Sequence, residues 1–222
     1  MQIKYMKIQE EQKKIFVIGF NKTGTKSLHN IFKSSKIKSI HTTQCVMQII
    51  DKHDAFADGN HLNFNEYYEK YPDSLFILNT RPIKNWLISR YKHAKAPWNN
   101  FRNNCWCWPV SEFKTNSWIT TREKHYENIF DFFNEPDRHK QLFVVNIEKE
   151  GWENAVLKFI NKPPLSNPSH QNKREDSEIP EDKMELIRTN VTQCLKSKGY
   201  DENEILYKGV QMSKYNQYSM FL

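Results

Sequence analysis

The sequence predicts an α/β fold in a single domain, with a central, mostly parallel sheet flanked by helices. Two observations carry this prediction: three short apolar runs have the pattern of buried strands, and segments with helical spacing follow them. The apolar runs are Lys14–Gly19, Ser74–Asn79 and Leu142–Ile147. Strands that alternate with helices form parallel sheets, and ligands bind at the carboxyl ends of such strands.

The other elements follow from spacing and from the positions of proline and glycine. Helices are expected at about Thr25–Ser35, Gln44–Lys52, Phe64–Tyr71, Pro82–Ala94, Ser117–Asn134, Trp152–Asn161 and Glu181–Ser197. Short strands are expected at Ile37–His41 and Ala55–Ala57. The length of 222 residues fits one domain. We expect this domain at residues 14–198, after an N-terminal extension at 1–13 and before a C-terminal tail at 199–222.

Composition narrows the class of protein. The net charge of +7 favours anionic partners, and basic residues spread along the chain favour a nucleotide pocket over a nucleic-acid surface. The four cysteines, Cys45, Cys105, Cys107 and Cys194, lack zinc-site spacing, and residues 1–14 lack an apolar signal-peptide core. We therefore expect free thiols and a cytoplasmic location. No apolar run reaches about 18 residues, so we expect no membrane span.

The most informative stretch joins the first apolar run to the first expected helix. A turn begins at Gly19 and contains Lys22, Thr23, Gly24, Thr25, Lys26 and Ser27. A strand, a glycine-bearing turn and a helix start form a phosphate cradle, because backbone N–H groups and the positive helix end face one anion. Thr25 separates Gly24 from Lys26, so the contiguous Gly-Lys-Ser of a Walker A loop is missing. The sequence thus predicts a P-loop NTPase-like sheet with an altered loop.

A second anion site is expected where the second buried strand ends. Arg81 and Pro82 follow that strand, and Ser89 lies seven residues beyond Pro82, which is about two helical turns. A guanidinium and a hydroxyl form a forked site for a dianionic phosphate. A magnesium-dependent P-loop NTPase usually places Asp at such a strand tip, so a cation argues against a metal–nucleotide site. In the alternative interpretation, Arg81 only caps the sheet edge and Ser89 is a surface hydroxyl.

Together the two motifs resemble those of the PAPS-dependent, P-loop-type sulfotransferases. Lys22-Thr-Gly-Thr25 is similar to their 5′-phosphosulfate loop, and the spacing of eight from Arg81 to Ser89 is similar to their 3′-phosphate site. Asp54-Ala-Phe-Ala-Asp58 ahead of Tyr71-Pro72, and the segment around Gly151-Trp152, also resemble parts of one subfamily. The resemblance covers about residues 14–175 and depends on the order and spacing of the motifs.

This resemblance implies transfer of a sulfuryl group from PAPS to an acceptor hydroxyl or amine, with release of adenosine 3′,5′-bisphosphate. It implies that Lys22 contacts the 5′-phosphosulfate, which the amides of residues 23–27 cradle with help from the Thr25 and Ser27 hydroxyls. It implies that Arg81 and Ser89 hold the 3′-phosphate. Such chemistry is electrostatic positioning, and we expect no metal. Lys26 stands where the family has Thr or Ser. It is a candidate second cation for the cofactor, and the alternative, which we favour slightly, is that it faces solvent.

The acceptor must lose a proton, so a general base is expected near the sulfur. Asp58 matches a position of the family and is the preferred candidate. His61, in a segment loosely similar to the catalytic histidine loop of cytosolic sulfotransferases, and His41, at the end of the second expected strand, are the alternatives. Each also has an ordinary structural interpretation: a turn residue for Asp58, an exposed histidine for His61 and a half-buried one for His41.

The later part of the chain gives weaker indications. Arg174 ends a segment, 168–174, that resembles a stretch folding over the nucleotide in related chains, although a solvated basic loop is the alternative. Tryptophans between Lys95 and Thr115 lie where the family has acceptor-binding loops, which favours a flat apolar acceptor, although such residues usually pin a loop to the core. We expect a small-molecule or glycan acceptor, with its identity open. Two other functions remain: a degenerate P-loop NTP-dependent kinase or NTPase, and a non-catalytic nucleotide- or RNA-binding module.

Overall fold

The computed structural model describes residues 13–42, 48–58, 63–94, 110–166, 179–208 and 218–222. Its centre is one sheet of six strands in the order β2-β3-β1-β4-β5-β6, and every neighbouring pair is parallel. The strands are β1 (Ile15–Val17), β2 (Ser39–His41), β3 (Ala55–Ala57), β4 (Leu75–Thr80), β5 (Leu142–Asn146) and β6 (Ser219–Phe221). The predicted α/β class with a parallel sheet is confirmed.

Six α-helices are present in the described part of the chain. They are α1 (Thr25–Ser34), α2 (Phe64–Lys70), α3 (Ile83–Ala94), α4 (Glu112–Phe133), α5 (Trp152–Phe159) and α6 (Glu181–Ser197). Helix α4 begins five residues earlier than predicted, because the Ser111 hydroxyl caps it by accepting from the Lys114 amide at 3.2 Å. Within the described residues, none of these helices combines the length and apolarity needed to cross a bilayer.

Short 3-10 segments complete the described secondary structure at η2 (Ile50–Lys52) and η3 (His139–Gln141). Part of the helix expected at Gln44–Lys52 lies outside the described residues, and its last residues form η2. The predicted strand at Ile37–His41 is shorter, since pairing with β3 begins at Ser39.

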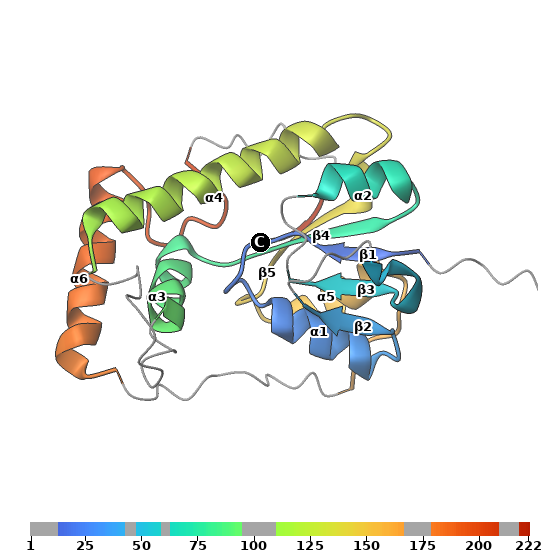
Figure 1. Ribbon diagram of the computed structural model, residues 1–222, viewed down its shortest axis with the longest axis horizontal. Coiled ribbons are helices and arrows are strands. Elements are labelled where there is room, and N and C mark those ends of the chain that lie inside the picture. The colour runs from blue at the N-terminus through green and yellow to red at the C-terminus, as the bar shows by residue number, and fades with distance from the viewer. Residues whose placement is uncertain (1–12, 43–47, 59–62, 95–109, 167–178, 209–217) are drawn as a thin grey trace, which may run out of the picture.

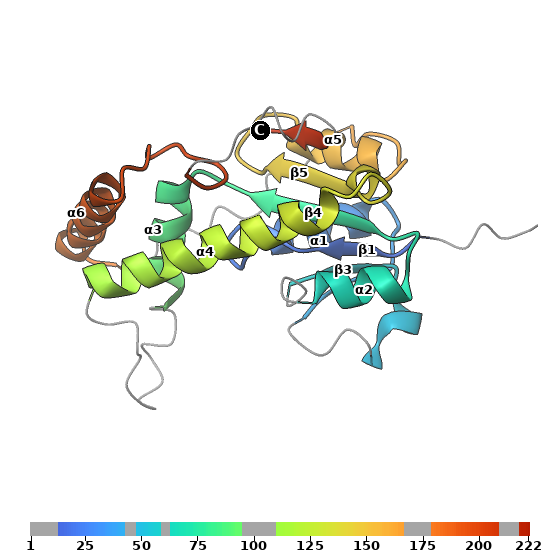
Figure 2. The ribbon, with the colours of Figure 1, turned by 90° about the horizontal axis from the view of Figure 1, so that it is seen from above.

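The sheet is covered by helices on both faces, as Figures 1 and 2 show. On β1, Ile15 and Val17 join one buried cluster with residues of α1 and α5. Phe16, between them, joins the other cluster with residues of α2, α3, α4 and α6. Because neighbouring strand residues point to opposite faces, a continuous apolar run is what a sheet buried on both sides requires.

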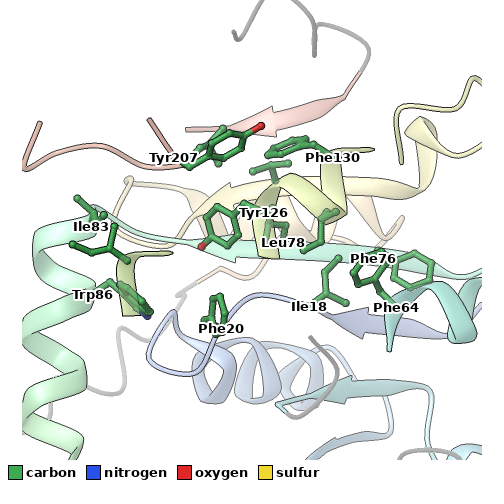
Figure 3. Close-up of a cluster of buried hydrophobic side chains, with 14 of the residues drawn as sticks. Ile18, Phe20, Phe64, Phe76, Leu78, Ile83, Trp86, Tyr126, Phe130 and Tyr207 are labelled. Carbon is green, nitrogen blue, oxygen red and sulfur yellow. The ribbon is translucent and has the colours of Figure 1, made fainter. Parts of the chain in front are cut away.

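The second cluster extends past the sheet to the turn after β1 (Figure 3). Phe20, in that turn, lies with its ring centroid 5.9 Å from Trp86 of α3 and 6.5 Å from Tyr126 of α4. Each of these rings is buried. The turn between β1 and α1 is therefore attached to the hydrophobic core.

The last part of the chain packs against the end of β4. The Ile83 amide donates to the Glu204 carbonyl at 2.9 Å, and the Lys84 amide donates to the Glu202 carbonyl at 3.3 Å. These bonds satisfy two N–H groups that the start of α3 would otherwise leave unpaired. Strand β6 then pairs with β5. Residues beyond 198, treated above as a tail, thus complete the sheet and cap a helix.

Candidate active site

The turn between β1 and α1 has the geometry of an anion-binding loop. Gly24, with φ of 88°, is the N-cap of α1, and the Leu28 amide makes a helical bond to the Gly24 carbonyl at 3.1 Å. The amides of residues 25–27 precede that bond, so the helix offers them no acceptor. The first turn of α1 contains no acidic residue. These amides and the positive end of the helix favour an anion at this position.

Asn79, near the end of β4, holds this loop in shape. Its Oδ1 accepts from the Gly19 amide at 3.1 Å, and its Nδ2 donates to the Thr23 carbonyl and to the Thr23 hydroxyl, both at 2.7 Å. A Cβ on Gly19 would lie 2.1 Å from the Asn79 carbonyl oxygen, so only glycine fits there. Thr23 is fully buried, and its hydroxyl also donates to the Phe20 carbonyl.

Arg81, one residue past β4, lies beside the loop. Its Nη1 donates to the Lys22 carbonyl at 3.4 Å, and its Nη2 forms an ion pair with Oε1 of Glu148. Oε2 of the same carboxylate accepts from Asn85 Nδ2 at 2.7 Å. The Nε of Arg81 is buried and has no hydrogen-bond partner among the described residues. Ser89 lies on α3, eight residues after Arg81, and is half-buried.

Helix α3 braces the loop from the same side. The Trp86 indole N–H donates to the Asn21 carbonyl at 3.1 Å, and Arg90 donates to the Asn21 side-chain oxygen. The Arg90 guanidinium lies over the rings of Trp86 and Trp118, at 5.3 and 4.6 Å from their centroids. The loop and α3 thus form one connected unit, since backbone and side chain of Asn21 are both bound.

A third group of polar side chains lies where β2 and β3 end. His41 Nε2 is 3.1 Å from the Thr25 hydroxyl and 3.8 Å from Oδ2 of Asp58. Asp58 follows β3 directly and has φ of 77°, a left-handed conformation that Asp tolerates better than most residues. Thr25 is the first residue of α1. Two of the three base candidates therefore lie together, and one of them, His41, contacts the first residue of α1.

His29 extends this group along α1. Its Nδ1 is 2.9 Å from the Ser39 hydroxyl, and its ring centroid is 6.1 Å from that of His41. Burial, and then the neighbouring His41, lowers the pKa of His29 below its usual value of 6.5. A neutral imidazole is consequently favoured at this position.

Of the remaining predicted site residues, two lie on the first turn of α1 and two lie outside the described residues. Lys26 is exposed and Ser27 is half-buried on the first turn of α1. His61 and Arg174 lie outside the described residues. Among the described residues, no three His, Cys, Asp or Glu side chains are grouped as they would be around a metal ion. Cys194 is a buried free thiol on α6.

Sequence reasoning missed three residues of this region: Asn79, Asn85 and Glu148. Asn79 had a local signal, because an amide at the end of an apolar strand needs a partner. Asn85 lies four residues after Arg81, one helical turn on, which is the spacing of neighbours on one helix face. Glu148 had no local signal, since it is 67 residues from Arg81 in the chain.

The fold is α/β with a parallel sheet flanked by helices, and comparison with known families adds the class of protein. The family model of the sulfotransferase domain matches residues 46–143, which include Asp58, Arg81 and Ser89. The predicted resemblance to sulfotransferases is thereby confirmed over this part of the chain, and sulfotransferase activity in general is supported. A search of curated proteins found no match.

Proposed function

We propose that this protein is a PAPS-dependent sulfotransferase that moves a sulfuryl group to a hydroxyl or amine of a small-molecule or glycan acceptor. The observation that carries the proposal is the link between two anion sites. Arg81 holds a carboxylate with Asn85 on one side and bonds to the Lys22 carbonyl of the phosphate loop on the other. A nucleotide with phosphates at both ends of its ribose matches two anion sites this close together.

The residues present fit such a nucleotide. The first turn of α1 has no acidic residue and its amides can bind an anion, and the buried Nε of Arg81 is a donor with no protein acceptor in the described part of the chain. A buried donor without a partner is unfavourable by about 1–3 kcal/mol, so an acceptor from a ligand stabilises it. In this assignment Arg81 and Ser89 bind the 3′-phosphate, and Lys22 with the amides of residues 23–27 binds the 5′-phosphosulfate.

The chain's own groups then act by position and charge. Bound PAPS supplies an activated sulfuryl group attached to a phosphate leaving group. Lys22 stabilises the negative charge that builds on that phosphate in the transition state. Asp58 takes the proton of the acceptor hydroxyl, and His41 Nε2 lies 3.8 Å from its carboxylate. Thr25 connects this pair to the phosphate loop through its bond to His41.

Calorimetry with two nucleotides tests the proposal. Adenosine 3′,5′-bisphosphate should bind at least about tenfold more tightly than AMP, which corresponds to about 1.4 kcal/mol for the 3′-phosphate contacts. Arg81→Gln should remove this preference and lower AMP affinity much less, because the substitution removes the 3′-phosphate contact but only one long bond, at 3.4 Å, to the Lys22 carbonyl of the phosphate loop. Arg138→Gln, five residues past the end of α4, is the matched control.

Three outcomes would contradict the proposal. Equal affinity of the wild type for the two nucleotides would mean that Arg81 and Ser89 do not read a 3′-phosphate. Strict dependence of binding on Mg²⁺ would favour the kinase or NTPase alternative, in which a metal ion bridges the phosphates. Binding of adenosine 3′,5′-bisphosphate without turnover of PAPS on any acceptor would favour a non-catalytic nucleotide-binding module.

A further inference from the structure

The carboxylate of Glu148 takes up the edge of Arg81 that a phosphate would use. Arg81 Nη2 pairs with one of its oxygens, and Asn85 Nδ2 donates to the other at 2.7 Å. We propose that Glu148 is a built-in competitor for the 3′-phosphate, which weakens the hold of the protein on nucleotides carrying that group and speeds release of the product. This inference rests on the proposed function.

Glu148 is fixed beside Arg81 by the backbone around it. The Ile147 amide donates to the Thr80 carbonyl at 3.0 Å, which joins the turn after β5 to the end of β4. The Glu148 amide is held by the Asn146 side chain at 3.0 Å. The Ile147 side chain also packs against Gly24, where an added Cβ would meet it at 2.6 Å. The turn that carries Glu148 therefore touches both anion sites.

The ion pair between Arg81 and Glu148 is weak enough for a ligand to displace Glu148. The side chains of Arg81 and Glu148 are 22% and 27% exposed, so solvent screens their attraction. Partly exposed ion pairs contribute about 0–1 kcal/mol. A phosphate dianion offers more charge and more acceptors than a carboxylate and binds guanidinium more strongly. A nucleotide without the 3′-phosphate gains nothing from displacing Glu148, so the competition acts only on nucleotides that carry this group.

The test compares Glu148→Gln with Glu150→Gln. The first substitution keeps the shape and one acceptor but removes the charge beside Arg81. The second removes the same charge from an exposed residue of the same turn, which no hydrogen bond or ion pair joins to Arg81 or Asn85 in the described part of the chain. Calorimetry would measure adenosine 3′,5′-bisphosphate and AMP on each variant, and stopped-flow chase experiments would measure dissociation rates.

Glu148→Gln should bind adenosine 3′,5′-bisphosphate about two- to fivefold more tightly, mainly through slower dissociation, with AMP affinity unchanged. Glu150→Gln should leave both affinities near the wild type. Weaker or unchanged binding of the bisphosphate by Glu148→Gln would overturn the inference, because Glu148 would then orient Arg81 or have no influence. An equal gain in bisphosphate affinity in both variants would also overturn the inference, because the loss of one negative charge anywhere on this turn would then explain the effect. These outcomes for the variants leave the proposed function intact. In this experiment, the proposed function fails as well only if the wild type binds adenosine 3′,5′-bisphosphate no more tightly than AMP.

Discussion

At the scale of single residues, positive φ angles fall into two groups: those explained by the end of a helix and those that lie in the candidate site. Four described residues other than glycine have positive φ: Lys22, Lys36, Asp58 and Asn161. Lys36 and Asn161 directly follow the C-caps of α1 and α5, where a left-handed residue commonly ends a helix. Lys22 and Asp58 have no such explanation. Unfavourable conformations of this kind gather at functional sites, which supports the roles proposed for both.

The conformation of Lys22 leads to a test in which stability and activity change in opposite directions. With φ of 68°, Lys22 is strained by about 1–2 kcal/mol relative to glycine. Lys22→Gly should therefore raise Tm by roughly 2–4 °C while lowering turnover far more than nucleotide affinity, because the lost charge acts mostly in the transition state. Thermal unfolding and steady-state kinetics measure the two effects.

Lys26→Ala is the control for Lys22, since Lys26 is an exposed cation four residues away. It should change turnover little. If Lys26→Ala lowers turnover strongly and Lys22→Gly lowers it little, then Lys26 and not Lys22 is the phosphate-binding lysine. The loop would then resemble a Walker loop more closely. Lys22→Ala should match Lys22→Gly in turnover but not in stability, because alanine keeps the strain.

Asp58 can be tested with a substitution that preserves its backbone. Asparagine also tolerates positive φ, so Asp58→Asn removes basicity without new strain. Turnover should fall by about 10²–10⁴-fold while binding of adenosine 3′,5′-bisphosphate is retained. His41→Asn should reduce turnover much less, because in this assignment His41 is a neighbour of the base. A larger loss for His41→Asn than for Asp58→Asn would assign the base to His41.

At the scale of elements, local patterns predicted the strands and helices but not what holds the loop between them. The run from Ile15 to Ile18 and the helix after Gly24 are visible in the sequence because burial on both faces and helical spacing are local properties. The bonds from Asn79 to Gly19 and Thr23 join residues 60 and 56 positions apart. No periodicity encodes such contacts, so the loop was predicted while its scaffold was not.

Asn79 should therefore control both stability and nucleotide binding. Asn79→Ala removes three buried hydrogen bonds, each contributing about 1 kcal/mol, so Tm should fall by roughly 5–10 °C. Affinity for adenosine 3′,5′-bisphosphate should fall as well, because the loop amides are no longer held in place. Asn65→Ala, the same change on the exposed face of α2, is the control. Wild-type Tm and affinity in Asn79→Ala would show that the loop keeps its shape without this side chain.

At the scale of the whole molecule, the C-terminal segment is part of the site's support. The sequence predicted α6 at the residues where it occurs, yet the segment after it was treated as a tail. Strand β6 has only three residues, of which none is buried, so it carries no pattern that distinguishes it from a loop. Its place in the sheet depends on pairing with β5, more than 70 residues earlier, which sequence patterns do not reveal.

One side chain connects this segment to the candidate site. Arg122 on α4 is fully buried, and in the described part of the chain no ion pair links it to a carboxylate. Its guanidinium donates to the carbonyls of Ile205 and Leu206, and also to the Arg81 carbonyl and the Thr80 hydroxyl at 3.2 Å. Its Nε has no hydrogen-bond partner among the described residues, but the bonds from its two terminal nitrogens fix the C-terminal segment against the end of β4.

Replacing Arg122 should loosen the C-terminal segment and the end of β4 together. Arg122→Met keeps much of the apolar volume but leaves several buried carbonyls without donors, so the stability should fall by about 3 kcal/mol. Amide exchange at Ile83 and Lys84 should become faster, because their acceptors lie on the released segment. Affinity for adenosine 3′,5′-bisphosphate should fall as well, because Arg81 directly follows β4, whose end Arg122 holds. Lys124→Met, an exposed change two residues further along α4, should alter none of these. Wild-type exchange at Ile83 in a destabilised Arg122→Met would limit Arg122 to a role in packing and separate the C-terminal segment from the site.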